Sequence, residues 1–169
     1  MTAARRRLNF YERAIATFGR TSAGYWYATR VAPRVDPTLL KATGGRFSSV
    51  YPLPVMLLTT IGAKSGLRRS LPLVYMTDGD ALIVIASNYG RPGHPAWYRN
   101  LIANPTVEVL AGARSGTYTA TEITDPAERD AAWDKALDAY AGYGDYEIKA
   151  TNRTIPVIRL TRVTSRRRR

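Results

Sequence analysis

The stretch SLPLVYMTDGDALIVIAS, residues 70–87, contains two runs of strand-forming residues separated by Asp78-Gly79-Asp80. Asp-Gly between two such runs is a strong tight-turn signal, because glycine adopts a positive φ without steric penalty. The stretch therefore predicts a β-hairpin.

Further strand patterns lie on both sides of this hairpin. TVEVLA and GTYTATEI form a second hairpin pattern around Gly112–Gly116, with PVMLLTT (54–60) before it and IPVIRL (155–160) after it. About six strands, joined mostly as hairpins and without βαβ alternation, predict an antiparallel barrel of the mainly β (α+β) class and disfavour a doubly wound fold.

Two helices are expected between these strands. HPAWYRNLIAN (94–104) suggests His94 as a cap and Pro95 at the first helical position. In residues 125–143, Asp125 is the expected cap, Glu128 completes a capping box and Gly142 ends the helix.

The N-terminal part is harder to assign to regular structure. Pro33 and Pro37 argue against a long helix in residues 21–37, and TLLKATGGRFSSVYP (38–52) suggests a short helix followed by a loop. We expect three parts: a basic N-terminal helical segment (1–50), a β-barrel domain (51–162) and a basic tail (163–169).

The chain of 169 residues suits one domain and carries a formal net charge of +12. Residues 1–46 hold nine Lys/Arg against two acids, residues 159–169 hold six arginines, and the remainder holds ten against eleven acids. The basicity therefore belongs to the ends, which favours solvated arms or contact with anionic lipid over nucleic acid.

The first residues show a stripe of apolar side chains at helical spacing, Leu8, Tyr11, Ile15 and Phe18, among arginines. Such a helix either packs on the domain or lies on an anionic membrane. With no apolar run that approaches membrane-spanning length and no signal-peptide core, we expect a cytoplasmic protein, able to lie peripherally on the inner face of the cell membrane.

Conventional catalytic groups are scarce. The absence of cysteine and a single histidine, His94, exclude thiolate chemistry and multi-histidine metal sites, so no metal is expected and a cofactor must carry any difficult chemistry. Tyrosine is abundant instead: Tyr140, Tyr143 and Tyr146 recur at every third position, either as core or as the wall of a flat apolar site.

The loop within LLTTIGAKSGLRRS, residues 57–70, resembles a phosphate-binding loop, but Ala63 stands where a P-loop requires glycine and a strand follows instead of a helix. An anion grip remains open, in which Gly62 and Gly66 turn backbone N–H groups inward beside Lys64, Ser65 and the arginines. The alternative is a solvated basic hairpin turn.

Three stretches, LLTTIGAKSGLRRSLPLVY, LIVIASNYGRPGHPAWYRNLIANPTVEV and AYAGYGDYEIKATNRTIPVIRL, in this order resemble the deazaflavin-dependent nitroreductase and quinone reductase family over about residues 53–161. The resemblance implies that residues 51–162 form a split β-barrel coenzyme-binding domain of the FMN-binding type. It also implies an oxidoreductase that uses reduced coenzyme F420 to transfer hydride to a small electron-poor acceptor, a quinone or a nitroaromatic.

The resemblance also implies site residues. Tyr143 is the expected catalytic proton or hydrogen-bond donor, and Val74, Tyr89, Tyr140 and Tyr146 are expected to shape the acceptor pocket. The expected coenzyme-binding residues are Lys64, Ser65, Gly66, Arg69, Ser70, Leu71, Pro72, Leu73, Ala86, Ser87, Asn88, Ala96, Trp97, Tyr98 and Asn100.

The sequence departs from the family pattern at three positions: Ala63 and Asn88 stand where family members often carry a positive charge, and Tyr89 stands where they often have glycine. Arg68 or Arg91 is a candidate to supply the missing positive charge. Two other functions stay open: an FMN-dependent split-barrel oxidoreductase, and a non-catalytic carrier of deazaflavin or lipid. The sequence leaves the oligomeric state unknown.

Overall fold

The structure is a computed structural model, and residues 21–163 are described here. Its centre is an antiparallel seven-stranded sheet with the spatial order β2-β1-β5-β6-β7-β4-β3. The strands are β1 (Val55–Ile61), β2 (Arg68–Val74), β3 (Met76–Asp78), β4 (Ala81–Ile85), β5 (Thr106–Leu110), β6 (Gly116–Glu122) and β7 (Val157–Arg162).

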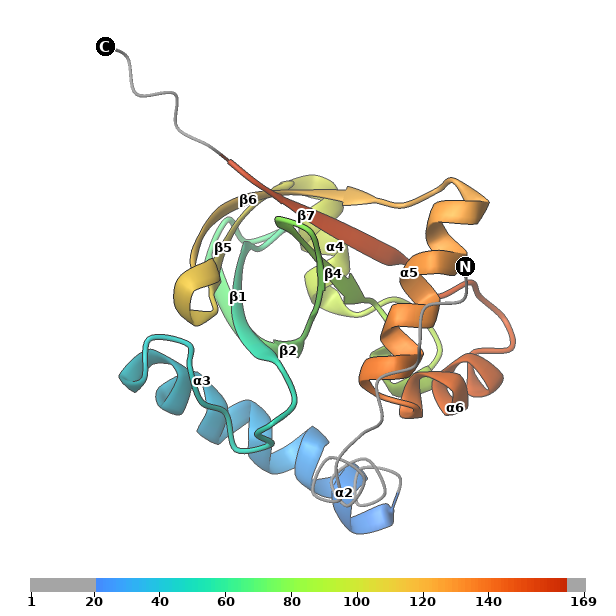
Figure 1. The fold of residues 1–169 in the computed structure, drawn as a ribbon, viewed down its shortest axis with the longest axis horizontal. Coiled ribbons are helices and arrows are strands. Elements are labelled where there is room, and N and C mark those ends of the chain that lie inside the picture. The colour runs from blue at the N-terminus through green and yellow to red at the C-terminus, as the bar shows by residue number, and fades with distance from the viewer. Residues whose placement is uncertain (1–20, 164–169) are drawn as a thin grey trace.

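The sheet curls into a barrel (Figure 1). Its two edge strands, β2 and β3, are consecutive in the chain and are separated by Tyr75 alone, whose N–H donates to the Pro54 carbonyl at 3.0 Å. One extended stretch of chain therefore belongs to both ends of the sheet. The expected split β-barrel of the α+β class is confirmed.

The hairpin predicted over residues 70–87 is correct only in its second half. β3 and β4 pair around the Asp78-Gly79-Asp80 turn, with Met76 opposite Ile83, but β2 pairs with β1, Leu71 lying opposite Leu58. Because of this switch, β1 has a partner on each side, β2 on one and β5 on the other. The hairpin predicted around Gly112–Gly116 is present between β5 and β6.

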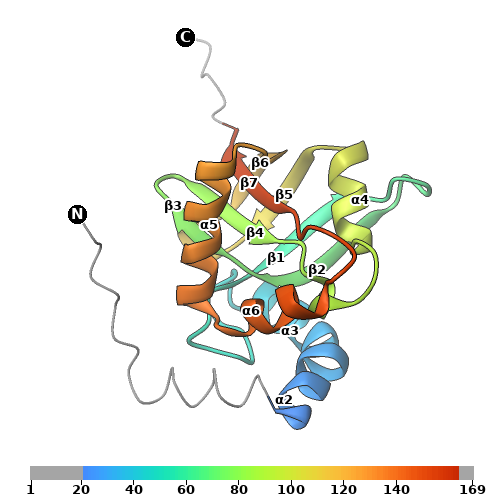
Figure 2. The same ribbon diagram turned by 90° about the vertical axis from the view of Figure 1, so that its right-hand side faces the viewer.

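The helices lie outside the barrel and cover it from several directions (Figures 1 and 2). A helical segment runs below it, α5 and α6 pack beside it, and α4 covers one end. Their bounds are α2 (Ser22–Trp26), the π-helix η1 (Tyr27–Val31), α3 (Ala32–Ala42), the short η2 (Asn88–Gly90), α4 (Ala96–Ala103), the short η3 (Gly112–Arg114), α5 (Pro126–Ala139) and α6 (Gly142–Lys149).

The expectation that two prolines exclude a long helix near the N-terminus is wrong, because α2, η1 and α3 follow one another without a break. Pro33 falls in the first turn of α3, where a missing N–H is tolerated. The preceding turn is π-type, and the Ala32 N–H donates to the carbonyl of Tyr27.

The later helices differ from expectation at their ends. Asp125 caps α5 by accepting from the Glu128 N–H at 2.9 Å, as predicted, but Gly142 opens α6 and does not end α5. His94 is not the cap of α4, because Pro95 occupies that position, and the His94 ring stacks on Tyr98 with centroids 4.8 Å apart.

The barrel interior is filled by apolar side chains. Leu58, Leu160 and Tyr118 have at most 1% of their surface exposed, and the Tyr118 hydroxyl donates to the Arg114 carbonyl at 2.7 Å. A second cluster joins the outer face of β4 and β7 to α5 and α6 through Ile83 and Trp133. Hydrophobic burial thus fixes these helices on the sheet.

Two predictions concern features outside the described residues: the apolar stripe from Leu8 to Phe18 and the arginines after residue 163. Within residues 21–163, no helix has the length and apolar content needed to cross a membrane. Within the same residues, no cluster of His, Cys, Asp or Glu has the arrangement of a metal site.

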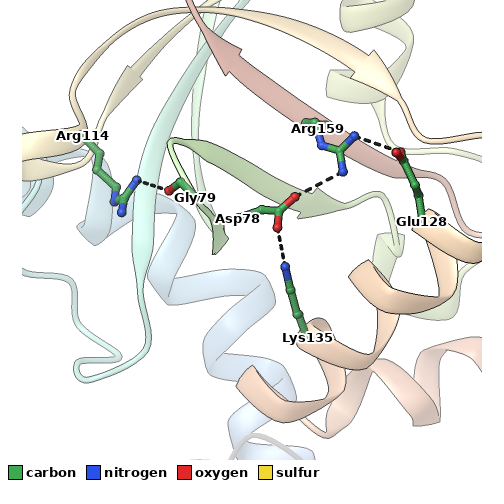
Figure 3. A network of polar contacts seen from close by, with 6 residues as sticks. All are labelled: Asp78, Gly79, Arg114, Glu128, Lys135 and Arg159. Atoms are coloured by element: carbon green, nitrogen blue, oxygen red, sulfur yellow. Dashed lines mark hydrogen bonds and ion pairs between the residues drawn. The ribbon is translucent and has the colours of Figure 1, made fainter. Parts of the chain in front are cut away.

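An ion-pair network fastens α5 to the sheet (Figure 3). Asp78 accepts from Lys135 and, at 3.2 Å, from Arg159, which also donates to Glu128 at 3.0 Å. The hydrogen bond from Lys135 is the main cause that holds the pKa of Asp78 below its usual value. The Glu128 side chain therefore binds Arg159 on β7 instead of completing the predicted capping box.

The network predicts a pH-dependent effect of Asp78→Asn. Loss of two half-exposed ion pairs should lower the free energy of unfolding by about 1 kcal/mol at neutral pH. Because the folded pKa of Asp78 lies below its ordinary value of about 3.9, this contribution is present above about pH 5 and disappears as pH falls through the folded pKa. Urea denaturation at several pH values measures it. Asp80→Asn in the same turn is the control, and a pH-independent difference would contradict the prediction.

Candidate active site

The candidate site is a cavity of about 1120 Å³ outside the barrel. Its walls come from β2, the loop between β1 and β2, the start of α4, the 85–89 segment, the tyrosines of residues 140–146, and the helices α2, η1 and α3. Single small-molecule sites usually occupy about 300–1,000 Å³. The cavity is therefore large enough for an extended ligand.

The free edge of the sheet forms the longest wall. Every residue from Arg69 to Val74 lines the cavity, and β2 pairs only with β1 in the described chain. An edge strand presents unpaired N–H and C=O groups, and Pro72 is tolerated because it lies on such a strand. Leu71 and Leu73 add apolar surface, so this wall suits a flat ring with polar groups along its rim.

One end of the cavity is cationic. Lys64 and Arg69 from the β1–β2 hairpin and Arg99 from α4 all line the cavity, and Ser65 adds a hydroxyl. The N-terminal turn of α4 has no side-chain cap, and Ala96 in that turn lines the cavity. Uncapped helix N–H groups and cations together attract phosphate or carboxylate groups.

The glycines of the β1–β2 loop have a different role from the one expected. The Gly62 N–H donates to the Leu67 carbonyl and the Gly66 N–H to the Gly62 carbonyl, both at 2.8 Å. These two N–H groups close the turn and are not available to a ligand. Gly66 is required because its φ is +66°, which favours glycine.

Asn100 connects this loop to the barrel. Its side-chain oxygen accepts from the Ala63 N–H and its amide nitrogen donates to the Thr60 hydroxyl, each at 3.0 Å. Thr60 is fully buried and donates to the Arg69 carbonyl at 3.4 Å. Asn100 lines the cavity, but its amide is used to position the loop that carries Lys64.

The other end of the cavity is aromatic. Tyr143 and Tyr146 lie three residues apart on α6, and Tyr140 lies at the end of α5; each ring contacts the other two at centroid distances of 5.6–6.1 Å. The Tyr140 and Tyr146 hydroxyls are 3.4 Å apart. Within the described residues no group hydrogen-bonds the Tyr143 hydroxyl, which leaves that donor for a ligand.

Burial controls the ionisation of these phenols. It is the main cause that raises the pKa of Tyr143, Tyr146 and Tyr89, with neighbouring tyrosines as further causes. All three hydroxyls therefore stay protonated at neutral pH and can donate hydrogen bonds. A group that must supply a proton to a developing oxyanion needs this property.

Most of the predicted site residues meet at this cavity. Those that line it are Lys64, Ser65, Arg69, Ser70, Leu71, Pro72, Leu73, Val74, Ser87, Asn88, Tyr89, Ala96, Trp97, Asn100, Tyr140, Tyr143 and Tyr146. Gly66, Ala86 and Tyr98 do not. Gly66 lies in the turn, Ala86 is fully buried in the barrel core, and Tyr98 donates to Glu122 at 2.7 Å. Burial and Glu122 raise the pKa of Tyr98 to about 12.

Neither arginine considered as a compensating charge belongs to the cavity wall. Arg68 forms a two-pronged ion pair with Glu108 on β5. Arg91 donates to the Tyr25 hydroxyl at 2.8 and 3.2 Å. The additional cation is Arg99, which was not predicted from the sequence. The available signal was its place in the first turns of the helix predicted to begin at Pro95.

The wall of the cavity formed by α2, η1 and α3 was not predicted from the sequence. Gly24, Tyr27, Ala28, Ala32, Pro33 and Asp36 line the cavity from α2, η1 and α3. Asp36 is buried and accepts from the Ser49 N–H at 2.7 Å, which fixes the loop leading into β1. The only available signal was the apolar content of YWYATRVA, which the two prolines obscured.

Residues 32–162 match the protein family described as F420H(2)-dependent quinone reductase. An F420H(2)-dependent quinone reductase of Mycobacterium tuberculosis is 38% identical over 134 residues, which are 76% of this chain and 89% of that protein. A solved F420-H2 dependent reductase is 41% identical, with 63% of this chain and 93% of the other covered and a TM-score of 0.56. Another solved structure, described as a domain-swapped dimer, is 34% identical, with 73% and 94% covered and a TM-score of 0.59.

The bridge formed by Asn100 predicts a local effect of Asn100→Ala. The substitution removes two hydrogen bonds and leaves the buried Thr60 hydroxyl with a poorer partner, so stability should fall by about 1–3 kcal/mol. Backbone amides of residues 62–67 should exchange faster with solvent, as hydrogen-exchange measurements would show. Ile102→Ala, an exposed position on the same helix, should leave this loop unchanged. Equal exchange in both variants would contradict the bridging role.

Proposed function

The chain belongs to the F420H(2)-dependent quinone reductase family, whose cofactor is reduced coenzyme F420, and from this premise we propose that the cavity holds the coenzyme and a quinone together. The observation that carries the proposal is the polarity of the cavity. Cations lie at one end, protonated phenols at the other, and a free sheet edge with apolar side chains joins them. A ligand with an acidic tail and a flat ring matches this order.

The residues present fit the coenzyme. Lys64, Arg69 and Arg99 would neutralise its phosphate and glutamate carboxylates, and Ser65 would donate a hydrogen bond. The unpaired backbone of β2 would contact the polar rim of the ring, while Leu71 and Trp97 exclude water from its faces. When bound, the reduced deazaflavin supplies a hydride.

The phenols would serve the acceptor. A quinone that gains a hydride develops negative charge on oxygen, and a preorganised donor stabilises this charge. Among Tyr140, Tyr143 and Tyr146, only the Tyr143 hydroxyl forms no hydrogen bond with a described residue. It would donate to that oxygen and deliver the proton, and Tyr140 and Tyr146 hold its ring in place.

The acceptor class follows from this chemistry. A quinone offers a flat ring and an oxygen that becomes anionic, which suits the aromatic end. A nitroaromatic compound has the same two properties, so we propose it as a second, weaker class of acceptor. The position of Tyr89 at this end restricts the size of both.

We also propose that the protein contacts an anionic membrane surface. From the end of α2 to the start of β1, three large apolar side chains are more than half exposed, those of Trp26, Phe47 and Tyr51. Basic residues accompany them at positions 30, 34, 41 and 46. Exposed aromatic rings among cations are suited to the interface of an anionic bilayer, where lipophilic quinones reside.

The direct test of function is oxidation of the reduced coenzyme. Mixing the protein with reduced F420 and a naphthoquinone should restore the absorbance of the oxidised deazaflavin, and reduced FMN should not substitute. Binding of F420 without oxidation by any quinone or nitroaromatic would support a carrier instead.

Tyr143→Phe separates proton donation from binding. Loss of the hydroxyl should lower kcat for the quinone about tenfold or more, because a positioned acid commonly contributes factors of ~10²–10⁴. The dissociation constant of the coenzyme should not change. Tyr146→Phe is the matched control in the same cluster and should retain most of the rate. An unchanged kcat in Tyr143→Phe would remove this tyrosine from the chemistry.

The membrane contact predicts a loss of binding in a variant with Trp26→Ala and Phe47→Ala. Sedimentation with vesicles of anionic lipid should fall severalfold relative to the parent, because apolar insertion is removed while the charge is retained. Vesicles of neutral lipid should bind both proteins weakly. Equal sedimentation of parent and variant would place the contact elsewhere.

A further inference from the structure

Tyr89 has an unusual backbone conformation for a bulky residue. Its φ is +57° and that of the preceding Asn88 is +49°, both in the left-handed region. Asparagine is common in this region, but a large aromatic side chain is not. Such a conformation persists when surrounding contacts determine it, and it is often found at functional sites.

The surroundings of Tyr89 fix its ring from several directions. The hydroxyl donates to the Ala28 carbonyl at 3.0 Å. The ring packs edge-on against Tyr25 and Tyr146, with centroids 5.7 and 5.8 Å apart, and the Arg91 guanidinium lies 5.8 Å from its centre. These partners come from the N-terminal helices, from α6 and from the same loop.

The acceptor of this hydroxyl is a carbonyl that the helix itself cannot satisfy. Ala32, which would donate to Ala28 in an α-helix, donates to Tyr27 because the turn is π-type. The next residue, Pro33, has no N–H. Tyr89 therefore supplies the missing donor, and the loop and the helical segment are joined across the cavity.

The loop backbone has no freedom to retreat. A side chain at Gly90 would lie 2.7 Å from the Lys149 side chain and 2.9 Å from the Tyr146 carbonyl, so the loop lies directly on α6. Asn88 also donates to the Gly93 carbonyl at 3.2 Å. The Tyr89 ring is thus held at a set position.

That position is a boundary between two cavities. Tyr89, Tyr140 and Tyr146 line both the large cavity and a second one of about 470 Å³. The second cavity is bounded on its other sides by residues that include Tyr25, Arg91 and Lys149. The three phenol rings form the partition, and Tyr89 is the one of them that comes from the segment between β4 and α4.

We infer that Tyr89 is a specificity-determining residue, which closes the acceptor end of the active site and restricts it to quinones without a bulky substituent on that side. This inference rests on the proposed function. Removing the ring joins the two cavities and provides space for a side chain on the quinone.

The test compares two acceptors in Tyr89→Gly and Tyr89→Asn. Both replacements tolerate a positive φ, so the backbone is retained. One acceptor is methyl-naphthoquinone, and the other has the same ring with a short hydroxyalkyl side chain. The ratio of kcat/KM for the substituted to the unsubstituted quinone should rise about tenfold or more in both variants, a change in the range of size discrimination by enzyme pockets.

Tyr89→Phe is the matched control, because it keeps the ring and loses only the bond to Ala28; its ratio should equal that of the parent. Variants that bind the coenzyme normally but keep the parental ratio would overturn the partition. Unfolding of both small replacements would also overturn it, since Tyr89 would then serve the core. A parent protein that oxidises no reduced F420 would instead refute the proposed function.

Discussion

The unpaired edge of β2 is the constraint on which the rest of the structure depends. The chain leaves the sheet at Tyr75 and re-enters at its other end as β3, so β2 has a partner on one side only. An exposed edge of this kind invites unwanted pairing unless something covers it. Here a cavity runs along it, enclosed by helices from the N-terminal segment, and the edge becomes a binding surface.

The enclosure also separates two kinds of chemistry. The β1–β2 loop and α4 bring Lys64, Arg69 and Arg99 to one end, and α6 brings protonated phenols to the other. In a partly buried site, charges and hydrogen bonds act more strongly than in water. Binding of an acidic tail at the cationic end therefore orients a ring without a covalent link, and the phenols meet whatever lies beyond it.

Local signals in the sequence predicted the elements that depend on neighbouring residues. The turn at Asp78-Gly79 and the cap at Asp125 are examples, since the residues that determine them lie within a few positions. Most of the coenzyme-binding residues that the resemblance to the family identified line one cavity. The resemblance was most informative for the hairpin around Lys64 and for the tyrosines of α6.

Long-range geometry was outside the reach of the sequence. Arg68 and Arg69 are neighbours in the sequence, but Arg68 pairs with Glu108, 40 residues away in the chain, whereas Arg69 lines the cavity. Pro33 suggested a break, whereas a π-type turn absorbs it and continues the helix. The wall formed by α2 to α3 depends on this continuous helix and was therefore not predicted.

The central claim is that the cationic end recognises the acidic tail of the coenzyme. Fluorescence titration with F420 and with the same deazaflavin lacking phosphate and glutamates tests it most directly. At low salt the tailed coenzyme should bind at least about tenfold more tightly than the tailless one, and the difference in affinity should narrow as salt screens the charges. Equal affinity for both at low salt would contradict it.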